Sequence, residues 1–91
     1  MKNMKVLELR SIQREEFGLY YRRTFTATVI LDLLSKTVEA PITFIIETSP
    51  LGTKTIDVDI DANNLLNYPS LPVTTAIKKY IQELDSQGGL P

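Results

Sequence analysis

The chain has 91 residues, which suits a single domain over residues 1–91 with a core of modest size. Hydrophobic residues make up 43% and charged residues 23%, which indicates a folded globular protein rather than a disordered one. The net charge of −1 excludes bulk attraction to nucleic acid or to an anionic membrane. The lack of cysteine and histidine excludes thiol chemistry and the commonest general base and metal ligand. No segment resembles a signal peptide or a membrane span, so we expect a cytoplasmic protein without membrane contact.

The first predicted strand runs over residues 5–13 and precedes a charged turn. Both of its faces carry apolar side chains, because Leu7 and Leu9 share one parity while Val6 and Ile12 share the other. We expect Leu7 and Leu9 to face the core.

The most regular pattern in the chain lies over residues 19–34, which we predict to be a long central strand. Every second position of one parity is apolar or aromatic, apart from Arg23. The apolar row consists of Tyr21, Phe25, Ala27, Val29, Leu31 and Leu33. The other parity is rich in threonine, which is typical of the solvent face of an antiparallel strand.

Two further strands follow, over residues 37–48 and 54–60, joined by a turn at residues 49–52. The first of them repeats apolar side chains at every second residue from Val38 to Ile46. Pro41 interrupts it and has no N–H to donate to a neighbouring strand. Pairing outward from the turn puts Ile60 level with Ile42, so Pro41 should lie just past the end of the fourth strand.

The last predicted element is a helix that ends at Gly88 and Gly89, after a loop with one helical turn near residues 64–66. Ser70 is the expected N-cap, and Pro72 suits the first turn. One apolar stripe with helical spacing runs along it. The stripe consists of Val73, Ile77, Tyr80, Ile81 and Leu84.

These elements predict an α+β fold, a four-stranded antiparallel β-meander with one C-terminal α-helix packed across one face (ββββα). The strand parities and the helical stripe converge on one layer, whose members should be nearly inaccessible to solvent. They are Phe25, Val29, Leu31, Ile42, Phe44, Ile46, Val58, Ile77, Ile81 and Leu84.

Outward-facing apolar residues suggest a function in protein association. Ile30 and Ile45 fall on the outer parity of the two long strands, and a single helix cannot cover both faces of a sheet. We therefore predict a non-enzymatic interaction domain, a homodimer or an accessory subunit of another protein. The candidate interface comprises Tyr20, Thr28, Ile30, Thr43 and Ile45.

The alternative is a single-stranded nucleic-acid-binding module. Tyr20, Arg22 and Arg23 combine an aromatic ring for base stacking with guanidinium groups for phosphate. Four strands followed by one helix also resembles the element order of PUR-type single-stranded nucleic-acid-binding domains. This resemblance covers element order alone, and it implies that the outer sheet face would bind the nucleic acid.

The remaining motifs favour no catalytic, cofactor or metal site. Asp57, Asp59 and Asp61 have the opening rhythm of a calcium-binding loop. The sixth position is Ala62 instead of glycine, and the twelfth is Tyr68 instead of a bidentate glutamate. We expect these aspartates to decorate an edge strand and to discourage edge-to-edge association.

Overall fold

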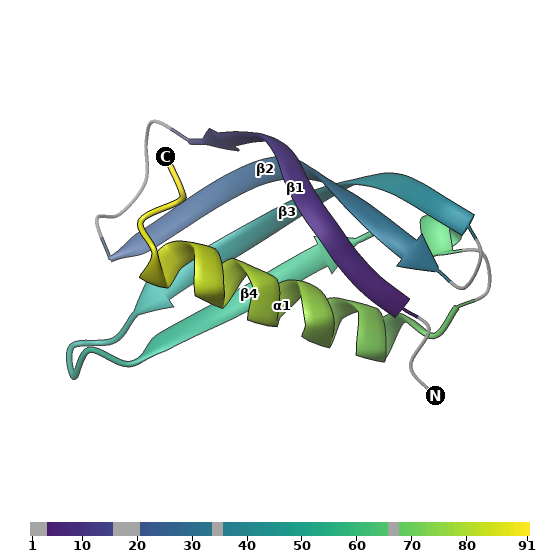
Figure 1. The fold of residues 1–91 in the computed structure, drawn as a ribbon. Coiled ribbons are helices and arrows are strands. Elements are labelled where there is room, and N and C mark those ends of the chain that lie inside the picture. Colours follow the sequence, from purple (N-terminus) through teal and green to yellow (C-terminus); the bar gives the residue numbers. More distant parts are fainter. Residues whose placement is uncertain (1–3, 16–20, 34–35, 66–67) are drawn as a thin grey trace.

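The computed structural model describes residues 4–15, 21–33, 36–65 and 68–91. Four antiparallel strands form one sheet in the order β1-β2-β3-β4, and one helix crosses one face of it (Figure 1). The predicted ββββα fold is therefore confirmed. The elements are β1 (Met4–Arg14), β2 (Arg22–Leu33), β3 (Lys36–Thr48), β4 (Lys54–Ile60), the 3-10 helix η1 (Ala62–Leu65) and α1 (Ser70–Ser86).

The core lies between α1 and the face of the sheet that α1 covers, here called the inner face. Phe25 of β2 and Phe44 of β3 are paired in register, fully buried, and stacked with ring centroids 4.8 Å apart. Helical spacing brings Val73, Ile77 and Ile81 of α1 onto this layer, where all three are fully buried. The period-two rows of the two long strands thus form the core, as predicted.

Two β-bulges in β1 resolve the conflict between its two apolar parities. The register with β2 shifts between Val6 and Glu8 and again between Arg10 and Gln13. Each extra residue reverses the alternation of side chains, so Val6, Leu9 and Ile12 all pack against the core. The expectation that Leu7 faces inward was wrong: Leu7 is the extra residue of the first bulge, and its side chain is 44% exposed.

Pro41 costs the sheet no hydrogen bond, because of where β4 ends. Ile60, the last residue of β4, pairs with Ile42, as predicted. Thr48 donates its N–H to the carbonyl of Tyr21 at 2.9 Å, on the β2 side of β3. Since successive N–H groups of a strand alternate in direction, a backbone N–H at position 41 would point toward the β4 side, beyond the last paired residue.

The helix ends as predicted but begins differently. Gly88 has φ +72°, and the N–H groups of Gly88 and Gly89 donate to the carbonyls of Asp85 and Leu84, which is a Schellman motif. The prediction of Ser70 as N-cap was wrong. Pro69 occupies the N-cap without a side-chain hydrogen bond, and Ser70 is the first helical residue.

The inner layer is less completely covered at its margins than the side-chain pattern predicts. Val58 and Leu84 are half-buried, which corrects the expectation that both are inaccessible. The reason is position: Val58 lies on the edge strand β4, and Leu84 lies in the last full turn of α1. Tyr21, at the end of the apolar row, is 45% exposed.

Candidate functional site

The outer face of the sheet, opposite α1, is assembled from the second parity of each strand. Its centre is uncharged, with Thr28 paired to Pro41, Thr26 paired to Thr43, and Ile45 next along β3. Charged side chains surround this centre. They include Lys5, Glu8, Arg10, Arg22, Asp32, Glu39, Glu47, Asp57 and Asp59.

Ile30 is not available on this face, which corrects the expectation that the chain leaves it uncovered. Its side chain is only 5% exposed. Ile30 lies between Glu8 of β1 and Glu39 of β3 in the register. Arg10 contacts both carboxylates, with its Nε 2.9 Å from Glu8 and its Nη1 3.6 Å from Glu39. A guanidinium that joins these two glutamates must pass over the residue between them, so charged neighbours cover Ile30.

The remaining candidate interface residues divide into two groups. The structure brings Thr28, Thr43 and Ile45 together at the uncharged centre, where all three are half-buried. Tyr20 lies outside the described residues. What is left of the predicted patch on the described surface is therefore smaller and more polar than the sequence suggests.

The two arginines of the nucleic-acid hypothesis point to opposite faces. Arg22 lies on the outer face, where its Nε is 3.6 Å from the carboxylate of Glu47. Arg23 lies on the inner face, where it donates two hydrogen bonds to Asp85 of α1. Their side chains therefore do not form one cationic surface.

A three-residue ion cluster, which the sequence reasoning missed, joins α1 to the inner face of the sheet. Asp85 accepts hydrogen bonds from Arg23 of β2 at 3.1 and 3.3 Å and from Lys54 of β4 at 2.8 Å. The side chain of Asp85 is only 10% exposed. A signal for this cluster was present in the sequence, because Arg23 and Lys54 fall on core parities and Asp85 follows Ile81 at the i+4 spacing of the apolar stripe.

The cluster also determines the titration of Asp85. A carboxylate in the last turn of a helix faces the negative end of the helix dipole, which disfavours its ionised form. The hydrogen bond from Lys54 nevertheless lowers the pKa of Asp85 below its ordinary value; burial opposes this effect, and Arg23 reinforces it. Asp85 is thus an anion that fixes the C-terminal end of α1 to two strands.

The aspartates of the calcium-like stretch do not gather into a site. Asp57 and Asp59 are exposed on the outer side of β4. Asp61 accepts a hydrogen bond from the N–H of Asn63 at 3.0 Å, which helps to start η1. Within the described ranges, no three side chains of the usual metal-binding types come together.

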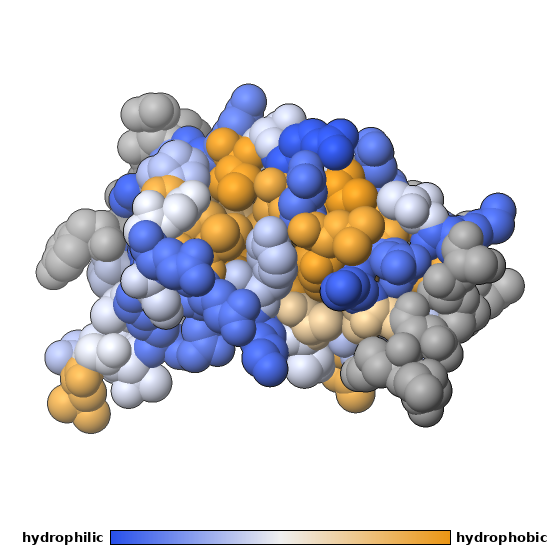
Figure 2. All heavy atoms as spheres, in the orientation of Figure 1, coloured by the Kyte–Doolittle hydropathy of each residue, from blue (hydrophilic) through white to orange (hydrophobic). Residues whose placement is uncertain are grey.

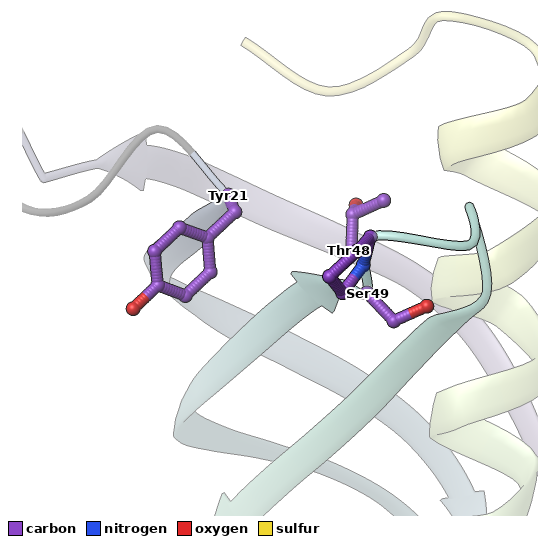
Figure 3. Close-up of a pocket in the computed structure, with 4 residues that line it drawn as sticks. Tyr21, Thr48 and Ser49 are labelled. Atoms are coloured by element: carbon purple, nitrogen blue, oxygen red, sulfur yellow. The ribbon is translucent and has the colours of Figure 1, made fainter.

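A hollow of about 500 Å³ lies where β2 begins and β3 ends (Figure 3). Tyr21, Thr48, Ser49 and Pro50 line it. The described lining offers hydroxyl groups and one aromatic ring, but no charged acid or base. It therefore contains no catalytic pair among these residues.

An apolar strip on the helix-bearing side is a second surface that the sequence reasoning missed. Figure 2 shows apolar side chains gathered between β1 and α1. Partly buried residues of both elements and of the C-terminal tail pack against the core. They include Val6, Leu9, Ile12, Ala76 and Leu90. The bulges of β1 create this strip, because they bring every third residue inward.

These features define a small α+β domain whose described residues form surface patches and an ion cluster rather than a catalytic constellation. The chain belongs to the BB_0187 family, whose family model matches residues 1–86. The family name states no activity, substrate or partner. No curated protein and no solved structure matches the chain. None of the helices in the described ranges combines the length and apolarity needed to cross a bilayer.

Proposed function

We propose that the protein is a cytoplasmic, non-enzymatic interaction domain that forms a homodimer through the outer face of its sheet. The observation that carries the proposal is the distribution of charge on that face. An uncharged centre of threonines, Pro41 and Ile45 is surrounded by a rim of charged side chains. Specific protein interfaces have this arrangement, with charged residues depleted at the centre and polar groups at the rim.

A second copy suits this face better than a nucleic acid does. The rim contains both signs of charge, as in the pair Arg22–Glu47 and the cluster of Arg10 with Glu8. Rotation about a two-fold axis can set opposite charges of two rims against each other. Acidic side chains outnumber basic ones around the centre, which opposes contact with phosphates.

The test compares the oligomeric state of two lysine variants by sedimentation equilibrium over a range of concentrations. The wild-type chain should dimerise, and Ile45→Lys should give a folded monomer because it puts a charge at the uncharged centre. Leu51→Lys, in the turn before β4 and exposed, should remain dimeric. A wild-type chain that stays monomeric at high concentration would overturn the homodimer, and association with another protein as an accessory subunit would then be the form of the proposal to test.

A third variant separates the outer face from the apolar strip. Ala76→Lys puts a charge on the strip between β1 and α1 while leaving the outer face intact. The proposal expects Ala76→Lys to dimerise like the wild type. If Ala76→Lys is monomeric and Ile45→Lys is dimeric, the dimer forms through the helix-bearing side and the outer-face proposal is wrong.

A further inference from the structure

The edge strand β4 has an unpaired side that points away from the sheet. It pairs only with β3, and Ser49 donates its N–H to Thr53 on the β4 side. Alternation along β3 then directs the N–H and C=O groups of Ile45 toward β4, so its partner Asp57 bonds to the sheet. The backbone groups of Ile56 and Val58 must therefore point outward, to the free edge.

The two edges of the sheet differ in their readiness to accept another strand. β1 carries two bulges, and Ser11 has φ +57°, so its edge lacks a regular hydrogen-bonding row. β4 pairs with β3 over all seven of its residues without a register shift. Regular backbone geometry of this kind is what strand addition requires.

The inner side of the β4 edge is a groove of about 560 Å³ between β4 and α1. Lys78 and Lys79 of α1 line it, both exposed, and neither forms an ion pair within the described part of the chain. Ile56 also lines it and is half-buried, as is its neighbour Val58. The groove thus combines uncovered apolar surface with positive charge.

The outer side of the same edge carries the opposite charge. Asp57 and Asp59 are exposed there, on the parity opposite to Ile56 and Val58. A strand added to β4 would place alternate side chains beside the lysines and beside the aspartates. Its two faces therefore need different charges.

We propose that the free edge of β4 binds an extended segment of a partner protein as a fifth strand. The inward side chains of this segment are acidic or aliphatic, beside Lys78 and Lys79, and its outward side chains are basic, beside Asp57 and Asp59. A second copy of this chain does not fit, because antiparallel pairing of two β4 strands sets aspartates against aspartates. This site is separate from the outer-face dimer, and either can fail without the other.

A short peptide of zero net charge tests the proposal. In acetyl-Thr-Glu-Lys-Val-Lys-Glu-Thr-amide, one face carries glutamate and valine and the other carries lysine. Its matched control, acetyl-Thr-Glu-Glu-Val-Lys-Lys-Thr-amide, has the same composition with both charges on each face. In titrations followed by amide chemical shifts, the first peptide should bind saturably, with shifts confined to β4 and the facing side of α1. Equal binding of both peptides, or shifts elsewhere, would overturn the charge pattern.

Backbone pairing is tested with two N-methylated versions of the first peptide, one methylated at its even positions and the other at its odd positions. Only one set of amides can face β4, so one version should bind and the other should not. Binding of the active version should slow hydrogen exchange at the amides of Ile56 and Val58 by about tenfold or more. If both versions bind alike, the peptide is not an added strand.

Charge reversal in the groove supplies an independent check. The double variant Lys78→Glu and Lys79→Glu should weaken binding of the first peptide by about tenfold or more, because two attractive contacts become repulsive. Lys36→Glu is the matched control, since Lys36 begins β3 far beyond the last residue paired with β4. Loss of binding in the control alone, or no loss in the double variant, would show that the groove does not recognise the segment.

Discussion

The guanidinium of Arg23 donates two hydrogen bonds to the carboxylate of Asp85, at 3.1 and 3.3 Å, across a separation of 62 residues in the chain. Lys54 donates a third hydrogen bond to the same carboxylate at 2.8 Å. The contact joins the start of β2 to the last turn of α1 at the margin of the core. It therefore sets the position of the C-terminal end of the helix over the sheet.

Asp85→Asn should lower the free energy of unfolding by about 2 kcal/mol, because it leaves Arg23 without a counter-charge while only 22% of the arginine side chain is exposed. Urea denaturation measures the difference. The matched control is Glu47→Gln, which removes the exposed contact with Arg22 and should change stability by no more than about 0.5 kcal/mol. Equal effects of the two substitutions would contradict a special role for Asp85.

The same contact should make stability depend on pH at the acidic end. Lys54 and Arg23 lower the pKa of Asp85 in the folded chain below the ordinary value of 3.8 expected when unfolded. The unfolded state therefore binds a proton first as the pH falls, and the stabilisation, complete above about pH 4, is lost as the pH falls through the folded pKa. The difference in unfolding free energy between wild type and Asp85→Asn should shrink below about pH 4. A difference that stays constant across this range would refute the assignment.

The stacked pair Phe25 and Phe44 should dominate the stability of the core. Each is fully buried, so truncation of either one to alanine should cost about 3–5 kcal/mol in urea denaturation. Because the rings stack at 4.8 Å, a double-mutant cycle should show a coupling energy of about 0.5–1.5 kcal/mol. Additive losses would mean that the rings contribute through burial alone.

Ile30 and Ile45 share the outer parity but should respond differently to truncation. Ile30→Ala should cost about 2 kcal/mol, since the side chain is buried under the Arg10 cluster. Ile45→Ala should cost less than about 1 kcal/mol in the monomer, because Ile45 is only half-buried. Thermal or urea unfolding at low protein concentration measures both. A larger loss for Ile45 would reverse the assignment of which isoleucine the chain covers.

The sequence by itself determined the element order, the register of the last hairpin and most of the core. Period-two rows in β2 and β3 and the i, i+4 stripe of α1 are local patterns, and burial of one face follows from them directly. The position of Pro41 past the end of β4 also followed, because hairpin pairing counts residues outward from a turn.

Only the tertiary structure decided which apolar residues of β1 face inward, that Ile30 is covered, and that Asp85 is held by Arg23 and Lys54. A bulge reverses parity at a residue such as Leu7 without a local sequence signal, because the partner strand determines where the extra residue fits. The cover of Ile30 depends on charged side chains from two other strands, and the ion cluster joins three elements. Such contacts depend on distances between segments far apart in the chain, which periodicity along the sequence does not contain.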